Sequence, residues 1–327
     1  MTFPSHDPSS HENPQRSSEE FADHQLLRAP QPQNHRLIPV TVHSVDYLTD
    51  TLLRIVVHAE ELKSYALSGP DEFFGLLMPP PNQPFSSPED FAATPIEGLN
   101  IRAAVAAMPP EVRPNLRWYT VRYLDKTRGL LAFDVATHGL NAQPTDASPH
   151  AEPSTDTPTG PGISWCLSAQ PGDPAGLWTC QGLWHREHRK QLLVADPSSL
   201  PSVRAILEYL ATLFPEQLAD THVIAVTSTD FDSEPHLEVW RNALGSLTKI
   251  TAPSEGYAQA IAEHLANIVV ESSRNQQHKL LPEVDYVWVA GEGDFCKMVR
   301  SHAIKTWRLN KDNILWCPYW FVGKARP

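Results

Sequence analysis

The chain has 327 residues, 41% of them hydrophobic, and a formal net charge of −12 without any Lys/Arg-rich run. This length and composition fit about two domains, and the acidic balance disfavours nucleic acid or an anionic membrane surface as a partner. We find no apolar stretch that predicts an integral membrane segment and no secretory signal at the start, so we expect a cytoplasmic protein. The four cysteines are scattered without a CxxC pair or a metal-ligand cluster, which favours reduced thiols and no metal site.

The first segment, residues 1–35, is rich in Pro, Ser, His, Glu and Gln and has no apolar period. Such a composition is typical of disorder, because it offers too little apolar surface to offset the entropy of ordering the chain. We therefore predict a disordered tail over residues 1–35.

Short runs rich in β-branched residues begin after the tail. We expect strands at 37–42, 52–57, 117–122, 130–134, 163–167 and 176–179. Short strands between Gly/Pro turns are typical of an antiparallel barrel. The segment 140–159, dominated by Pro, Thr, Ser, Asp and Ala, is interpreted as an insertion between two strands. The sequence thus predicts a β-barrel domain over residues 36–188.

Strands alternate with helices in the last part of the chain. The expected elements are strands at 191–195, 222–226, 247–250, 286–290 and 313–316 and helices at 200–214, 257–270 and 295–307. This alternation predicts an open, mostly parallel α/β sheet over residues 189–327.

A candidate binding strand is Arg117-Trp118-Tyr119-Thr120-Val121-Arg122, which forms a predicted hairpin with residues 130–134. An arginine fork pairs with a pyrophosphate, an aromatic ring stacks on an isoalloxazine, and a hydroxyl faces its polar edge. The strand pair is followed by His138-Gly139 and by a glycine-bearing segment at 160–165, where backbone N–H groups can approach a phosphate. The pattern favours a flavin dinucleotide, with an ordinary exposed strand face as the alternative.

Gly291-Glu292-Gly293 lies between a predicted strand and a predicted helix, at the carboxyl end of a parallel strand where nucleotides bind. A tight turn without a ligand is the alternative. Asp230 and Asp232 follow the second strand of the same sheet. Carboxylates there accept hydrogen bonds from a ribose 2′-hydroxyl and repel a 2′-phosphate, which favours NADH over NADPH.

Several motifs in the same order resemble the siderophore-interacting protein family, the FAD-dependent, NAD(P)H-driven ferric-siderophore reductases. The resemblance covers about residues 36–327. It rests on R-x-Y-T-x-R at 117–122, His138-Gly139, Gly160-Pro161-Gly162-Ile163-Ser164-Trp165 with Pro171-Gly172-Asp173, Leu192-Leu193-Val194-Ala195-Asp196 through Pro201, and Val287-Trp288-Val289-Ala290-Gly291-Glu292 with Arg300, Tyr319-Trp320 and Gly323. Ile163 stands where the family has a phosphate-binding serine, and Ser164 is displaced by one residue.

The resemblance implies a six-stranded antiparallel FAD-binding barrel followed by an NAD(P)H-binding α/β domain of ferredoxin-reductase type. It implies that FAD passes electrons from NADH or NADPH to a ferric siderophore, so that no catalytic acid–base group is expected. Cofactor contacts are expected from Arg117, Tyr119, Thr120, His138, Gly139, Gly162, Ile163, Ser164, Asp196, Gly291, Glu292, Tyr319 and Trp320. Lys324 is the candidate contact for an anionic ferric chelate, with a solvated terminus as the alternative. A general flavin reductase and a non-catalytic siderophore-binding or iron-delivery protein remain open.

Overall fold

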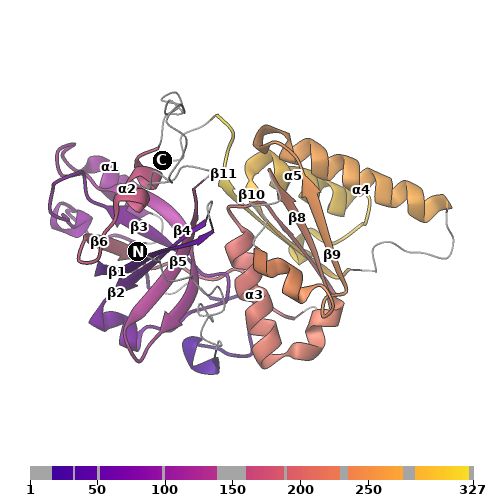
Figure 1. Cartoon of the computed structure of the whole chain (residues 1–327), viewed down its shortest axis with the longest axis horizontal. Coiled ribbons are helices and arrows are strands. Elements are labelled where there is room, and N and C mark those ends of the chain that lie inside the picture. Colours follow the sequence, from indigo (N-terminus) through magenta and orange to yellow (C-terminus); the bar gives the residue numbers. More distant parts are fainter. Residues whose placement is uncertain are drawn as a thin grey trace, which may run out of the picture.

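The computed structural model describes residues 17–31, 34–49, 52–97, 100–137, 160–187, 190–228, 235–274 and 284–323. A barrel and a helix-flanked sheet lie side by side (Figure 1). Within the described residues, no helix has the length and hydrophobicity needed to cross a membrane. Short 3-10 turns occur at Ser18–Glu20, Glu60–Ser64, Pro88–Asp90, Pro215–Asp220, Pro235–Trp240, Ser254–Gly256 and Lys311–Asn313.

The first unit is a closed barrel whose neighbouring strands are antiparallel, in the order β1-β2-β5-β4-β3-β6. Its strands are β1 (Leu37–Thr49), β2 (Leu52–His58), β3 (Phe73–Met78), β4 (Asn115–Asp125), β5 (Leu130–Ala136) and β6 (Pro174–Trp178). In β1 the buried residues Ile38, Val40 and Val42 alternate with more exposed ones, because successive side chains of a strand point to opposite faces. The predicted six-stranded antiparallel barrel is confirmed, although not all of its predicted strands are correct.

The strand expected at 163–167 is wrong, because this segment forms helix α2 (Pro161–Ser168). Gly160 is its N-cap and Pro161 stands at its start, where the fixed φ of proline favours a helix and its missing N–H costs nothing. The strand that completes the six-stranded barrel is instead β3, which the sequence pattern did not predict. Its side chains alternate between the barrel core and a second apolar cluster beneath helix α1 (Ile101–Ala107), so β3 is apolar on both faces.

The second unit is a parallel five-stranded sheet of order β11-β10-β7-β8-β9. Its strands are β7 (Gln191–Ala195), β8 (Thr221–Thr227), β9 (Ser246–Thr251), β10 (Tyr286–Glu292) and β11 (Ile314–Trp320), and its helices are α3 (Leu200–Leu213), α4 (Tyr257–Arg274) and α5 (Gly293–Lys305). Alternate residues of β7 pack with α3 on one face and with α4 and α5 on the other. The predicted parallel α/β sheet is confirmed.

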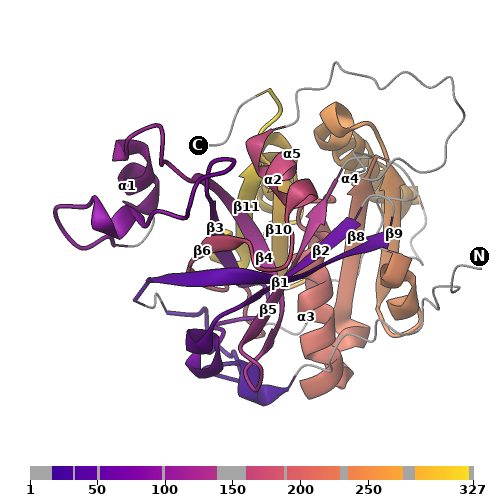
Figure 2. The same ribbon diagram turned by 60° about the vertical axis from the view of Figure 1, so that its left-hand side comes forward.

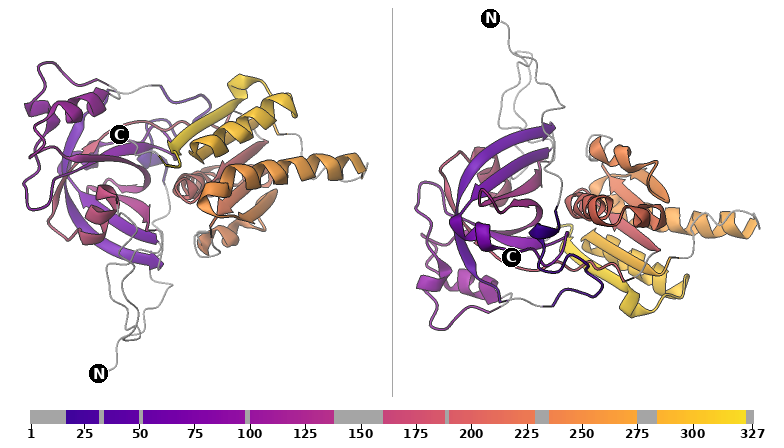
Figure 3. Two further views of the ribbon diagram at one scale, coloured as in Figure 1. Left: turned by 90° about the horizontal axis from the view of Figure 1, so that it is seen from above. Right: turned by 90° about the horizontal axis from the view of Figure 1, so that it is seen from below.

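Helix α3 lies between the sheet and the barrel (Figures 1 and 2), whereas α4 projects away from the barrel (Figure 3). Beside α3, the buried Asp71 joins the two units. Its carboxylate accepts hydrogen bonds from the backbone N–H groups of Leu183 and Trp184 and from the indole of Trp288 on β10. The predicted domain boundary at 188/189 falls outside the described residues and stays a prediction.

The predicted disorder of residues 1–35 is wrong for the described part of that segment. Phe21 forms a bridge with Leu67 and an edge-to-face contact with Tyr209 on α3, at 5.1 Å between ring centroids. Leu26 is only 2% exposed, and Arg186 donates to the carbonyl of Gln25. Isolated apolar residues without a period thus order this segment by packing on both units.

Candidate functional site

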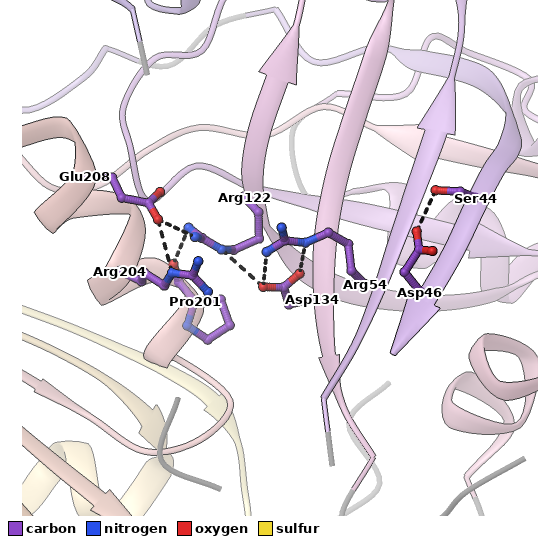
Figure 4. Close-up of polar contacts among 8 residues, drawn as sticks. All are labelled: Ser44, Asp46, Arg54, Arg122, Asp134, Pro201, Arg204 and Glu208. Carbon is purple, nitrogen blue, oxygen red and sulfur yellow. Dashed lines mark hydrogen bonds and ion pairs between the residues drawn. The ribbon is translucent and has the colours of Figure 1, made fainter. Parts of the chain in front are cut away.

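A buried ion-pair network lies where the barrel faces α3 (Figure 4). Arg54 on β2 pairs in register with Asp134 on β5 and donates two hydrogen bonds to its carboxylate, at 2.7 and 2.9 Å. Arg122 also donates to Asp134, at 3.2 Å, from an irregular position of β4 between Val121 and Tyr123. Burial would raise the pKa of Asp134, but the guanidinium of Arg54, followed by that of Arg122, lowers it, so the carboxylate stays ionised.

The same network extends from Arg122 onto α3. The Arg122 guanidinium donates to the Glu208 carboxylate at 2.9 Å and to the Pro201 carbonyl at 3.2 Å. Arg204 donates to the same Glu208 oxygen at 3.1 Å. Because the Arg122 side chain is completely buried, these bonds fix β4 against the first turns of α3.

A chain of hydroxyl groups crosses the same seam. The Thr120 hydroxyl lies 2.8 Å from that of Ser202 on α3, and Ser202 lies 3.0 Å from the hydroxyl of Tyr319 on β11. Burial raises the pKa of Tyr319, so its phenol is neutral and can donate. The chain thus brings two predicted cofactor residues, Thr120 and Tyr319, to one point through Ser202, which sequence reasoning did not identify.

Two cavities open along the seam. The large seam cavity has a volume of about 530 Å³, and the small seam cavity one of about 150 Å³. Both are lined by Trp118, Tyr119, Asp134, Ser198, Pro201 and Tyr319, so they adjoin. Arg117, Ile163 and Trp320 line only the large one, whereas Phe73, Arg102, Thr120 and Cys317 line only the small one.

The large seam cavity contains a site that suits a pyrophosphate. Arg117 lies against the first turn of α2, where a Cβ added to Gly162 would come within 2.7 Å of the Arg117 Cγ. The first N–H groups of a helix have no acceptor within the helix and carry partial positive charge. The Arg117 guanidinium donates to the Leu116 carbonyl at 2.7 Å, and Arg117 and Ile163 both line the large seam cavity. An arginine and a helix N-terminus are the kinds of donor that bind a dinucleotide phosphate.

Tyr119 lies between the barrel core and α2. Its ring is 5.0 Å from that of Phe133, and its hydroxyl is 3.5 Å from the Cys166 sulfur. Burial raises the pKa of Tyr119 well above its ordinary value, so the phenol remains neutral. An uncharged aromatic ring that lines both cavities fits one side of a flavin ring.

Asp196, a predicted cofactor residue, is fully buried at the end of β7. Its carboxylate accepts hydrogen bonds from the hydroxyl and N–H of Ser198, the N–H of Glu292 and the indole of Trp320. Gly291 permits this arrangement, because its φ is +138° and an added Cβ would lie 2.5 Å from the Asp196 Cγ. Asp196 thus joins β7, β10 and β11 through bonds within the protein.

Glu292, also a predicted cofactor residue, is the N-cap of α5. Its carboxylate accepts from the N–H groups of Asp294 and Phe295, at 2.7 and 2.8 Å. These are the N–H groups that would hold a phosphate at this helix end. The turn at Gly291-Glu292-Gly293 is therefore closed by the protein's own carboxylate.

The remaining predicted residues are distributed as follows. Ser164 lies on α2, lines a separate cavity with Trp165 and donates to the Gly160 carbonyl at 3.3 Å. His138, Gly139 and Lys324, together with Asp230, Asp232 and the predicted insertion at 140–159, lie outside the described residues. The roles assigned to the predicted site residues stay predictions.

Comparison with known proteins agrees with this arrangement. The profile of the siderophore-interacting FAD-binding domain matches residues 41–184, and that of the siderophore-interacting protein matches residues 188–323. No match is found among curated protein sequences.

Three solved structures illustrate the shared fold. The siderophore-interacting protein SipS from Aeromonas hydrophila is 20% identical, with 89% of this chain and 94% of that one covered and a TM-score of 0.58. A siderophore utilization protein from T. fusca is 18% identical, with 91% and 97% covered and a TM-score of 0.61. A ferredoxin NADP+ reductase from Neisseria gonorrhoeae with bound FAD and NADP is 14% identical, with 82% and 90% covered and a TM-score of 0.50.

The two matching profiles follow each other along nearly the whole chain, in the order of the barrel and the parallel sheet. The chain therefore belongs to the siderophore-interacting protein family, as an FAD-binding protein with the oxidoreductase fold of the ferredoxin reductases.

Proposed function

We propose that the protein reduces ferric siderophores with bound FAD, using electrons from NADH or NADPH. The observation that carries the proposal is the pair of adjoining seam cavities. One is lined by Arg117 and by Ile163 at the start of α2, and the other is lined by Thr120, where the hydroxyl chain begins. Membership in the siderophore-interacting family points to the substrate class.

The proposed binding mode divides the cofactor between the two cavities. Arg117 and the N–H groups of Gly162 and Ile163 hold the pyrophosphate, and Tyr119 packs on the ring system. Thr120, held by Ser202, orients the polar edge of the ring. His138 and Gly139 are further proposed contacts on the phosphate side. Bound FAD accepts a hydride and releases single electrons, which is the chemistry that ferric reduction requires.

The ferric chelate is proposed to approach the seam where the ring is exposed, with Lys324 as a contact. Hard oxygen ligands hold Fe(II) much less well than Fe(III), so one-electron reduction is sufficient to release the metal. The protein needs no nucleophile or general base for this reaction. Its residues bind and orient the reactants.

NADH is the proposed reductant, with Asp230 and Asp232 as the acidic groups that favour a free ribose 2′-hydroxyl over a 2′-phosphate. Anaerobic steady-state kinetics with both dinucleotides test this preference. A higher kcat/KM with NADPH would reject it.

The function itself is tested on purified protein supplemented with FAD. We expect flavin absorbance to remain after gel filtration, to bleach with NADH under argon, and to return when a ferric siderophore is added while an Fe(II) indicator develops colour. Bleaching without iron reduction would select a general flavin reductase. A colourless protein that binds the ferric siderophore would select a non-catalytic carrier.

A further inference from the structure

The described N-terminal residues 17–31, here called the N-terminal strap, are anchored on two loops of the barrel. Leu67, in the segment before β3, exchanges two backbone hydrogen bonds with the strap, at 2.7 and 2.8 Å. Lys126, in the β4–β5 turn, donates from its ammonium group to the Glu19 carbonyl at 3.1 Å. In the view from below in Figure 3, the indigo start of the described chain lies between the barrel and the unit that contains the parallel sheet.

The other side of the strap packs on the second half of α3. The ring of Phe21 meets that of Tyr209 edge to face, and the Tyr209 hydroxyl donates to the His24 carbonyl. Phe21 is only 6% exposed, and Tyr209 is completely buried. The strap therefore makes both an apolar and a polar contact with one residue of α3.

Arg186 connects the strap to the segment between β6 and β7, which joins the two units. Its N–H donates to the Leu26 carbonyl at 2.8 Å, and its Nε donates to the Gln25 carbonyl at 2.6 Å. Its guanidinium carbon lies 3.5 Å from the centre of the Phe214 ring, at the C-terminal end of α3. Leu26 itself has a φ of +43°. A leucine keeps this strained conformation only where the surrounding contacts fix it, so the strap follows one specific path.

The strap extends the attachment of α3 beyond the contacts that the barrel strands make. Ser202 reaches the Thr120 hydroxyl at the start of α3. Arg122 reaches Glu208 further along the helix. Tyr209 follows Ser202 by seven residues, which is about two turns, so the two side chains lie on the same face of α3. Because a short helix moves largely as one body, a strap that holds Tyr209 also limits where Ser202 lies relative to Thr120.

We propose that the N-terminal strap is an interdomain clasp, which fixes α3 on the barrel and so preforms the seam at Thr120 and Ser202. The matching family profiles begin at residue 41, so the strap lies outside the part of the chain that they cover. A seam that is already formed binds a ligand more tightly, because less of the protein must be ordered on binding. The clasp depends only on contacts within the chain, whereas its effect on FAD rests on the proposed binding mode.

Hydrogen exchange of the full chain, measured by mass spectrometry without FAD, tests the clasp. The N–H groups of Leu67 and Arg186 both donate to strap carbonyls, so the peptides that contain them report its detachment. For Phe21→Ala we expect these amides to exchange roughly tenfold faster or more, because truncation of a buried phenylalanine weakens the packing that holds the strap. Peptides from β5 and β10 should change by less than about twofold, since both units stay folded.

The link to the seam is tested by flavin fluorescence titration of the same variant, for which we expect the FAD dissociation constant to rise roughly fivefold or more. Tyr209→Phe removes only the hydrogen bond to the His24 carbonyl. It should accelerate the two reporter amides roughly fivefold, and it carries the test if Phe21→Ala does not fold. The matched control is Phe91→Ala, the same substitution at a phenylalanine that is 49% exposed. It should leave both amides and the FAD affinity unchanged.

Each outcome decides a separate part of the proposal. Unchanged exchange at Leu67 and Arg186 in both strap variants would overturn the clasp. Equal acceleration in β5 and β10 would also overturn it, because the strap would then not detach separately from the two units. Faster exchange at the reporters with unchanged FAD affinity would overturn the link between the clasp and the seam. If the wild-type chain binds no FAD, the proposed binding mode fails, while the exchange data still decide the clasp.

Discussion

Replacement of Arg122 by methionine tests whether the ion-pair network holds the barrel against α3. The Arg122 side chain is fully buried and donates to Asp134, Glu208 and the Pro201 carbonyl. Two of these bonds join charged groups, each worth about 1.5–3 kcal/mol, and the third is worth about 1 kcal/mol. Methionine avoids the desolvation of a guanidinium, and Asp134 and Glu208 keep their other arginine partners. We therefore expect the free energy of unfolding to fall by about 3 kcal/mol.

The assay is denaturant unfolding at 25 °C, followed by both tryptophan fluorescence and far-UV circular dichroism. Arg128→Met on the exposed β4–β5 turn is the matched control and should change the free energy of unfolding by less than about 0.5 kcal/mol. A double-mutant cycle with Glu208→Gln should give a coupling of about 1 kcal/mol or more between the barrel and α3. A loss below about 1 kcal/mol in Arg122→Met, or no coupling to Glu208, would refute the idea that this network holds the seam.

Three further substitutions address other parts of the molecule. Gly291→Ala places a Cβ 2.5 Å from the Asp196 Cγ at a φ of +138°, so it should lower the free energy of unfolding in denaturant titrations by about 3 kcal/mol. The control Gly160→Ala, with open space around it, should lower it by less than about 1 kcal/mol. Gly162→Ala should displace the flexible Arg117 side chain, which lies 2.7 Å from the new Cβ. The FAD dissociation constant, measured by flavin fluorescence titration, should therefore rise about tenfold without a matching loss in the free energy of unfolding. Burial raises the pKa of Glu72 from 4.5 to about 7. Because the folded-state pKa is the higher one, the free energy of unfolding is highest below pH 4.5 and falls by about 3 kcal/mol as the pH rises through 7. Glu72→Gln should flatten this pH dependence in unfolding titrations at about pH 5 and about pH 8. An unchanged pH slope in Glu72→Gln would show that another group causes it.

The hydrophobic pattern of the sequence predicted the strands that are buried along their whole length. The β7, β8 and β10 runs are apolar because both faces of the sheet are covered by helices, so they stand out in the sequence. The segment 163–167 was wrongly predicted as a strand because Ile163 and Trp165 favour strands. The preceding Gly160-Pro161 instead starts a helix there. Phe21 and Leu26 escaped notice because two apolar residues without a period form no pattern.

For the candidate site, the sequence indicates residue types but not the contacts between distant segments. Arg117, Tyr119 and Thr120 were predicted as cofactor contacts because their residue types match the groups of a flavin dinucleotide, and the structure places Tyr119 and Thr120 at the small seam cavity. Contacts between distant segments could not be predicted, since Thr120 and its partner Ser202 are 82 residues apart. Asp134 and Arg54 are 80 residues apart, and only the barrel register places them opposite each other. A local motif can therefore name a ligand class without revealing which neighbours hold its residues in place.

The carboxyl ends of β7 and β10 restrict where a dinucleotide phosphate can bind on the parallel sheet. Nucleotides bind at this edge of open α/β sheets because helix N–H groups face the phosphates. Here Glu292 takes the N–H groups of Asp294 and Phe295, and Asp196 takes that of Glu292. A pyrophosphate placed on α5 would meet a carboxylate instead of free donors, which is repulsive. A dinucleotide at this edge of the sheet would therefore place its phosphates away from the first turn of α5.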